Sequence, residues 1–364
     1  MANKDMVKTL CAIDFIKGTD IGGPTINNNR IIQSKLNEYI EFVPVYHDMS
    51  FGRGISLKRI LDLRNQLKKI KPDILLFSGV QLAAFHILIA SILAGQKSRF
   101  MIIRGFSFDA LDISIFKRFL LGFFIEPLCF AMCTKFVGNS FFSANRLVSK
   151  IFWWKNKGYI HNLLPAKEHI PIEKLEILKS ELNISNDKII ISSVGRITID
   201  KGYKLLAEAI LHLSKSRSDF IFVISGDGNY MQEFKDFIKQ NKLEAYVKLL
   251  GKRSDINELN LISEIFVLPS LHETLSSALM EASMSSCALV ATDTGGIVEI
   301  VKNGFNGYTF QVGNKEQLIE KIEILLEDNI LRAQMGKNAL NFIDNNFSNK
   351  DLEDKLKNFL VTDE

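Results

Sequence analysis

The sequence has little cysteine and little proline, with four and seven of these residues among 364. So few cysteines exclude a small secreted domain that depends on disulfides. The whole chain is 47% hydrophobic and 24% charged and contains 22 glycines, which excludes collagen-like and disordered chains. At roughly 150 residues per domain, the length predicts two globular domains.

The sequence also lacks a hydrophobic run long enough to cross a membrane. Its longest apolar stretch, residues 119–133, is shorter than the ~20 residues of a transmembrane helix, and Glu126 and Pro127 interrupt it. This stretch predicts a buried or interfacial helix. The first nine residues do not resemble a secretory signal, so we expect a cytoplasmic protein with reduced thiols.

Charge is distributed unequally along the chain, whose net charge is +4. Residues 1–170 contain 23 Lys and Arg against 12 Asp and Glu, whereas the remainder contains 22 against 29. This difference indicates that the N-terminal half meets an anionic surface or substrate, and drift between the halves is the alternative.

Short apolar runs alternate with helical patterns in both halves, which is typical of parallel sheets covered on both faces. In the first half, strands are predicted at 7–16, 40–45, 74–77, 100–103 and 135–137, with helices at 27–39, 57–70, 82–94 and 113–133. In the second half, strands are predicted at 189–194, 220–225, 247–250, 264–268 and 288–291, with helices at 203–214, 231–241, 278–285 and 317–326.

The fold class is therefore α/β, with two tandem Rossmann-like, doubly wound domains and an interdomain cleft. Residues 161–188 are irregular and contain Pro165 and Pro171, so the boundary is placed there. We expect domains at 1–165 and 166–345, and a C-terminal helix at 346–364 that packs back toward the N-terminal domain. Ligands of such sheets bind at the carboxyl ends of the strands.

Two glutamates follow the strand predicted at 264–268, in the sequence PSLHETLSSALMEA. Backbone N–H groups at 274–277, where a helix should begin, form an anion site suited to phosphate. Glu281, two turns into that helix, can accept hydrogen bonds from the paired hydroxyls of a ribose. Taken singly, Glu273 could merely complement the helix dipole, and Glu281 could belong to a solvated face.

Basic residues and glycines follow other strands of the second half. Gly195 and Arg196 end one strand, and Lys201 opens the next helix. An arginine and a lysine at a glycine turn suit a diphosphate. The planar guanidinium of arginine can donate two parallel hydrogen bonds to a phosphate, and the lysine ammonium acts as a point charge. Further loops at 251–255 and 292–296 follow other strands, so the set is typical of a nucleotide-diphosphate site, although each basic residue alone could simply be exposed.

This half resembles the retaining GT-B glycosyltransferases of family GT4. The resemblance is carried by GRITIDKG (195–202), ISGDGNY (224–230), LLGKRSD (249–255), FVLPSLHETLSSALMEA (266–282) and ATDTGGIVEIVKNGFNGY (291–308). These segments cover most of residues 189–310 in the order and spacing of the family. Where the family commonly has Gly-Phe-Gly after the first glutamate, this chain has Thr274-Leu275-Ser276, which narrows the sugar pocket.

The resemblance implies a role for each matching residue. Arg196 and Lys201 would bind the donor diphosphate, Glu281 the ribose, and Glu273 the hydroxyls of the transferred sugar. The remaining residues would bind the donor through their backbone groups or by letting the donor approach the backbone closely. They are Gly195, Lys252, Arg253, Thr274, Leu275, Ser276 and Ser277.

The N-terminal half matches the family more loosely. Gly22 and Gly23 resemble its glycine loop near the donor phosphate, although a plain strand–helix turn is the alternative. Arg104 stands where many relatives have a His. An arginine stays protonated and cannot act as a base, but it could stabilise the leaving phosphate or position the acceptor. The alternative is a structural arginine paired with Asp109 or Asp112.

No cofactor and no metal are expected. Asp-x-Asp, a diphosphate-metal signature, does not occur in the sequence, so Arg196, Lys201 and the helix terminus would replace a cation. Retention in this family needs no protein nucleophile, because the leaving diphosphate can take the acceptor proton.

Aromatic residues accompany basic ones in two segments, which is typical of a membrane interface. The pattern in residues 115–130 fits a membrane contact and a buried core equally well, whereas the pattern in residues 152–157 favours a membrane contact. The predicted lipid contacts are Lys117, Arg118, Trp153, Trp154, Lys155 and Lys157.

We therefore expect a retaining glycosyltransferase that acts peripherally on the inner face of the cytoplasmic membrane. It would transfer a hexosyl or N-acetylhexosaminyl group from a nucleotide-diphosphate sugar, with UDP favoured and GDP next. The acceptor would be a polyprenyl-diphosphate-linked saccharide in bacterial O-antigen, lipopolysaccharide or capsule synthesis, and no nucleic acid is expected as a partner. The alternatives are a GT-B epimerase or phosphorylase and a non-enzymatic two-lobed sugar-binding protein.

Overall fold

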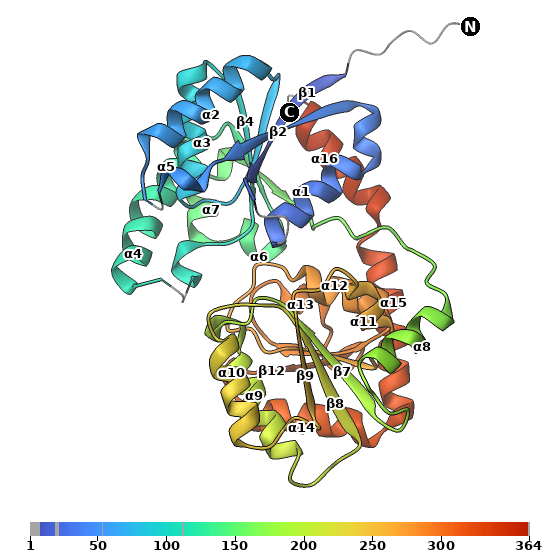
Figure 1. The fold of residues 1–364 in the computed structure, drawn as a ribbon. Helices are drawn as coiled ribbons and strands as arrows, with labels where there is room; N and C mark the ends of the chain where they lie inside the picture. The colour runs from blue at the N-terminus through green and yellow to red at the C-terminus, as the bar shows by residue number, and fades with distance from the viewer. Residues whose placement is uncertain (1–7, 19–21, 53, 111–112, 363–364) are drawn as a thin grey trace, which may run out of the picture. The chain divides into compact units, whose positions relative to one another are not determined.

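The computed structural model describes residues 8–18, 22–52, 54–110 and 113–362. The chain forms two compact units, residues 1–163 with 349–364 and residues 164–348. The division falls two residues before the predicted boundary, and the C-terminal segment belongs to the N-terminal unit. Figure 1 shows each unit as a sheet flanked by helices.

The N-terminal unit contains a six-stranded parallel sheet with the order β2-β1-β3-β4-β5-β6. Its strands are β1 (Thr9–Ile16), β2 (Ile40–His47), β3 (Ile74–Ser78), β4 (Ser98–Ile103), β5 (Lys135–Gly138) and β6 (Asn156–Tyr159). Its helices are α1 (Gly23–Gln33), α2 (Leu57–Ile70), α3 (Leu82–Ala94), α4 (Ile115–Leu120), α5 (Glu126–Met132), α6 (Phe141–Ala144), α7 (Leu147–Ile151) and α16 (Asn349–Val361). Short 3₁₀ turns η1 (Lys35–Glu38), η2 (Met49–Phe51), η3 (Ser107–Asp109) and η5 (Trp153–Lys155) and the π-helical turn η4 (Leu121–Ile125) join them.

The C-terminal unit repeats this plan with the strand order β12-β11-β10-β7-β8-β9. Its strands are β7 (Ile189–Val194), β8 (Phe220–Ser225), β9 (Val247–Gly251), β10 (Ile265–Leu268), β11 (Ala288–Thr292) and β12 (Gly307–Phe310). Its helices are α8 (Ile172–Glu181), the 3₁₀ turn η6 (Ile199–Lys201), α9 (Tyr203–Leu213), α10 (Met231–Gln240), α11 (Ile256–Leu261), α12 (Ser277–Met284), α13 (Ile297–Ile300), α14 (Lys315–Glu327) and α15 (Asn329–Asn346).

The core of each unit lies between its sheet and the covering helices. In the C-terminal unit β8 is buried along its whole length, and side chains such as Phe222 and Phe266 are fully enclosed. Because both faces of a parallel sheet are covered, its central strands read as continuous apolar runs, which explains why the sequence revealed them.

Three helical segments differ from expectation. The segment 161–188, expected to be irregular, contains helix α8. The helix predicted at 113–133 is divided into α4, the π turn η4 and α5, and Pro127 lies in the first turn of α5. Proline fits that position because its missing N–H is unneeded there. The helix predicted at 27–39 begins earlier, at Gly23 with Pro24 in its first turn, and ends at Gln33.

Each sheet has one point where the chain order reverses. In the C-terminal unit the chain builds outward from β7 to β9 and then places β10 on the other side of β7. In the N-terminal unit the corresponding reversal lies between β1 and β3. The loops after the strands at such switch points diverge, and this leaves the crevice in which open α/β sheets bind ligands.

Candidate functional site

The loops after β7 and β10 meet at the switch point of the C-terminal sheet. Gly202, between η6 and α9, has a φ of 75°, and an added Cβ would lie 1.9 Å from the carbonyl oxygen of Pro269. The backbone N–H of Leu271 donates to the carbonyl oxygen of Asp200 at 2.9 Å. This close approach, which only glycine permits, brings the basic loop 195–202 against the acidic loop 269–276.

Lys201 and Glu273 form an ion pair at this junction. The ammonium of Lys201 lies 2.7 Å from Oε1 of Glu273, and both side chains are less than one-fifth exposed. The hydroxyl of Ser270 donates to the same carboxylate oxygen at 3.2 Å. The structure therefore brings together two of the residues predicted to carry the chemistry, and it holds the Glu273 carboxylate in a fixed position.

Arg196 lies in the same loop and is more exposed. Its guanidinium is 3.7 Å from Oδ2 of Asp200, and its side chain is 61% exposed. Asp200 itself is buried, and the same oxygen lies 3.9 Å from Nε2 of His272. The sequence analysis missed Asp200 and His272 as site residues. The adjacency of Asp200 to Lys201 and of His272 to Glu273 was the available signal.

Helix α12 begins within this site. Ser276 is its N-cap, and its hydroxyl accepts a hydrogen bond from the backbone N–H of Leu279 at 3.2 Å. Thr274, Leu275 and Ser276 are buried, and their contact with the donor through the backbone stays a prediction. Ser277 is the first residue of the helix, and Glu281 follows one turn later.

Lys252 and Arg253 follow β9, two strands from β7 at the same edge of the sheet. The guanidinium of Arg253 donates to both carboxylate oxygens of Asp255, with an Nε to Oδ1 distance of 2.7 Å. Lys252 is 60% exposed and lies 3.9 Å from Asp227. The Arg253 side chain is thus engaged by Asp255, which leaves the backbone as the predicted contact with a base.

Arg104 lies in the N-terminal unit, at the end of β4. Its guanidinium donates to Oδ1 of Asn162 at 2.5 Å and to the Ser78 hydroxyl at 3.1 Å. Burial lowers the pKa of Arg104 to about 10, with nearby Asp14 acting in the opposite direction, so the group stays charged at neutral pH. The proposed pairing with Asp109 is wrong, because Asp109 pairs with Arg146 at 3.0 Å, and Asp112 lies outside the described residues.

Gly22 and Gly23 lie beside the switch point of the N-terminal sheet. Gly22 is the N-cap of α1, and the backbone N–H of Ile26 donates to its carbonyl oxygen at 2.9 Å. An added Cβ at either glycine would meet no described atom within 4 Å. A ligand could therefore approach the backbone there, although residues 19–21 of the predicted loop lie outside the described residues.

Two further features bear on binding partners. Within the described residues, no group of three or more His, Cys, Asp or Glu side chains is arranged to hold a metal ion. The described helices include none whose length and hydropathy would allow it to span a bilayer.

Comparisons with known proteins identify related sequences. Residues 175–342 match the family model "Glycosyl transferases group 1". The chain is 31% identical over 302 residues to the N,N'-diacetylbacillosaminyl-diphospho-undecaprenol alpha-1,3-N-acetylgalactosaminyltransferase of Campylobacter jejuni, covering 80% of this chain and 77% of the relative. It is 26% identical over 336 residues to the UDP-Gal:alpha-D-GlcNAc-diphosphoundecaprenol alpha-1,3-galactosyltransferase of Escherichia coli, covering 90% and 86%.

Solved structures share the fold. HepE of Anabaena, crystallised with UDP and glucose, superimposes with a TM-score of 0.77 at 17% identity, covering 95% of this chain and 97% of HepE. WaaG, a glycosyltransferase involved in lipopolysaccharide biosynthesis, gives a TM-score of 0.75 at 16% identity, covering 96% and 99%. The two parallel sheets thus have the GT-B architecture.

The two predicted Rossmann-like α/β domains and the predicted glycosyltransferase activity are confirmed, and the non-enzymatic sugar-binding alternative is wrong. The chain belongs to the glycosyl transferases group 1 family and is a glycosyltransferase.

Proposed function

We propose that the protein transfers a sugar, with retention of anomeric configuration, from a nucleoside-diphosphate sugar to a polyprenyl-diphosphate-linked saccharide. UDP is the favoured nucleotide and GDP the next. The observation that carries the proposal is the junction of Arg196, Lys201 and Glu273 at the switch point of the C-terminal sheet. The names of the Campylobacter jejuni and Escherichia coli relatives, which act on diphospho-undecaprenol-linked sugars, support the acceptor class. Similarity to the capsular polysaccharide biosynthesis glycosyltransferase CapM of Staphylococcus aureus supports a role in bacterial surface polysaccharide synthesis.

In this proposal the basic loop stabilises the leaving diphosphate. The bond between the anomeric carbon and the donor phosphate oxygen breaks, and negative charge develops on the diphosphate. Arg196, Lys201 and the N–H groups at the start of α12 meet that charge, and fixed dipoles of this kind cost little reorganisation. The acceptor hydroxyl attacks from the same face, and its proton passes to the diphosphate, so the protein needs no nucleophile and no metal.

Glu273 and Glu281 recognise the two ends of the donor. The carboxylate of Glu273, fixed by Lys201 and Ser270, accepts hydrogen bonds from hydroxyls of the transferred sugar. Glu281 accepts from the ribose. Arg104 adds a partly buried positive charge at the acceptor side, where it would meet the acceptor diphosphate.

The lipid-linked acceptor also implies contact with the inner face of the membrane. The side chains of Phe116, Trp153 and Trp154 are 75%, 72% and 56% exposed, so they belong to the surface rather than to the core. Lys155 differs from expectation, because its ammonium donates to the carbonyl oxygens of Phe130 and Cys133 at the end of α5. The proposed lipid contacts are therefore Lys117, Arg118 and Lys157 with the exposed aromatic residues.

A two-stage assay tests the proposed function. Thermal unfolding is first measured with UDP-, GDP-, ADP- and CDP-sugars, where a ligand at 100 times its Kd adds about 2.7 kcal/mol of stability. The stabilising donor is then incubated with a polyprenyl-diphosphate-linked N-acetylhexosamine, and the product is analysed by NMR. An extended lipid-linked saccharide with the donor's anomeric configuration supports the proposal. Inversion would refute retention, and epimerisation or phosphorolysis of the donor without transfer would favour the alternative enzymes.

A further inference from the structure

The loop that begins with Arg104 is held by the helical segment downstream of it. The backbone N–H of Ser107 donates to the buried carboxyl group of Glu126 at the start of α5. Burial raises the pKa of Glu126 to about 7, with the hydrogen bond from Ser107 acting in the opposite direction. The guanidinium of Arg146 lies over the Phe106 ring, and its Cζ atom is 5.1 Å from the ring centroid.

Phe108, in the middle of η3, packs against this helical segment most closely of all. An added Cβ at Gly122 would lie 2.2 Å from the Phe108 ring, so the ring occupies the space that any other residue would fill. The rings of Phe119 and Phe123 meet Phe108 edge-on, with centroid distances of 5.7 and 5.2 Å. They stack on one another at 5.5 Å, and such aromatic pairs add about 0.5–1.5 kcal/mol beyond the area they bury.

The packing coincides with the π-helical turn η4, which contains Gly122 and Phe123. Single π turns inside α-helices are rare, and many of those that are found lie at functional sites. Here the turn separates two helices with different surroundings. α5 contributes Cys129 and Phe130 to the core, whereas every residue of α4 is at least partly exposed.

The outer side of the same segment is an exposed apolar face. We call it the α4–η4 face, and its members are Ile115, Phe116, Phe119, Leu120, Phe123 and Phe124, which are 47–75% exposed. Figure 1 shows α4 at an outer margin of the N-terminal unit. Lys117 and Arg118 accompany the face in a half of the chain with a large excess of positive charge, so an anionic lipid surface is the occupant that its chemistry fits.

Phe119 and Phe123 therefore have two roles, because each ring contacts Phe108 on one side and is about half exposed on the other. We propose that the cluster of Phe108, Phe119 and Phe123, closed by Gly122, couples docking of the α4–η4 face on anionic lipid to the order of the loop that carries Arg104. Phe108 is thus a positioning residue for the acceptor side. This inference rests on the membrane contact in the proposed function.

Hydrogen–deuterium exchange with vesicles tests the coupling. Wild-type protein is measured alone and with phosphatidylglycerol–phosphatidylcholine vesicles, and sedimentation determines the bound fraction. Binding should slow exchange in residues 115–125 and, by at least about threefold, in residues 104–110. Slowing in 115–125 alone would overturn the coupling and leave the membrane contact intact. Absence of sedimentation at any anionic content would overturn both.

Two variants separate coupling from docking. In Gly122→Ala the added methyl group displaces the Phe108 ring, while alanine favours the helix more than glycine does. This variant should bind vesicles as wild type does but lose the slowing of exchange in residues 104–110. Phe108→Leu should behave alike if Gly122→Ala does not fold.

The matched control is Phe124→Ala, on the exposed face but outside the cluster. It should bind vesicles more weakly and keep wild-type exchange in 104–110 without them. Retained slowing in both Gly122→Ala and Phe108→Leu would overturn the proposal.

Discussion

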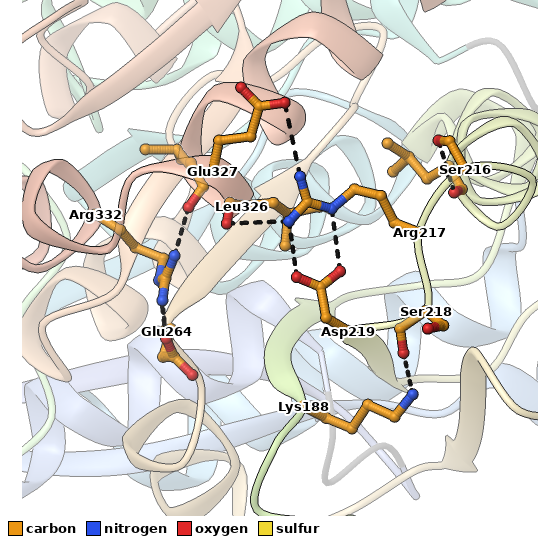
Figure 2. A network of polar contacts seen from close by, with 11 residues as sticks. Lys188, Ser216, Arg217, Ser218, Asp219, Glu264, Leu326, Glu327 and Arg332 are labelled. Carbon is orange, nitrogen blue, oxygen red and sulfur yellow. Dashed lines mark hydrogen bonds and ion pairs between the residues drawn. The ribbon is translucent and has the colours of Figure 1, made fainter.

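The C-terminal sheet has tightly paired basic residues at both ends of its strands, and Arg196 differs from them. Figure 2 shows the edge where the strands begin, and there Arg217 donates to both carboxylate oxygens of Asp219 at 3.0 and 2.7 Å and also lies 3.7 Å from Glu327. Arg332 is bound similarly, by Glu264 at 2.8 Å and by the carbonyl oxygen of Leu325 at 2.6 Å. Where the strands end, Arg253 is bound by Asp255 in the same way, but Arg196 is 61% exposed, and its guanidinium lies 3.7 Å from Asp200.

This difference shows which charges serve the fold and which are suited to a ligand. The hydrogen bonds between Arg217 and Asp219 raise the pKa of the arginine and lower that of the aspartate, so each holds the other charged. Arg217 also donates to the carbonyl oxygen of Leu326 in α14, so it joins the loop before β8 to that helix. The basic residues after β7 instead lie at a strand switch point beside the start of α12. An incoming diphosphate would place its negative charge next to them there.

Removal of the cations at the switch point should have the largest effect. Lys201→Ala and Arg196→Ala each remove a charge that meets the leaving diphosphate, so sugar transfer should fall by roughly 100- to 1000-fold. Steady-state rates measured with a saturating donor check this, and circular dichroism checks that the variants are folded. Rates within about threefold of wild type would show that these charges do not act in transfer.

Glu281→Ala should have the next largest effect, and it should act on nucleotide binding. The loss of a charged acceptor for ribose hydroxyls costs about 1.5–3 kcal/mol, or roughly 10- to 100-fold in Kd. Titration of the free nucleoside diphosphate measures this loss directly. Equal affinities for wild type and variant would remove Glu281 from the site.

Glu273→Gln should change binding and catalysis in opposite directions. The substitution removes the negative partner that lies 2.7 Å from the Lys201 ammonium, so the free nucleoside diphosphate should bind severalfold more tightly. Sugar transfer should fall, because the amide is a weaker acceptor for the sugar hydroxyls. Calorimetric titration and transfer rates provide the two readouts, and weaker nucleotide binding would contradict the proposed electrostatics.

Arg217→Ala should have the smallest effect on function. It removes one positive charge, as Lys201→Ala does, but from the other edge of the sheet. We expect a loss of about 1 kcal/mol in unfolding free energy, seen by urea denaturation, with nucleotide affinity unchanged. A large loss of affinity would mean that net charge, rather than position, governs binding.

The sequence predicted the central elements well, because β7, β8 and α3 are nearly continuous apolar runs and α2 is amphipathic. β7, β8, α2 and α3 have the predicted bounds 189–194, 220–225, 57–70 and 82–94. The sequence analysis missed the edge strands β6 and β12, whose sequences NKGY and GYTF carry little apolar signal. It also missed the π turn, at which the Phe108 ring packs against Gly122 from a separate segment, a contact that no local pattern reveals.

The candidate site was predictable where it depended on loops that follow apolar strands. The carboxyl ends of parallel strands share one edge, so Arg196, Lys201 and Glu273 could be assigned to one site before the structure was known. The contacts of Asp200 and His272 could not, because they depend on the close approach of two loops at Gly202. The pairing of Arg104 with Asn162 joins residues 58 positions apart, which no local pattern reveals.

The central claim is that positive charge at the switch point binds the nucleoside diphosphate without a metal ion. Calorimetric titration of UDP and GDP in EDTA, into wild type, Lys201→Ala and the charge-matched Arg217→Ala, tests it most directly. We predict that wild type and Arg217→Ala bind one of the nucleotides with equal affinity and that Lys201→Ala binds it at least about tenfold more weakly. Binding that disappears in EDTA and returns with magnesium, or equal affinities of all three proteins, would contradict the claim.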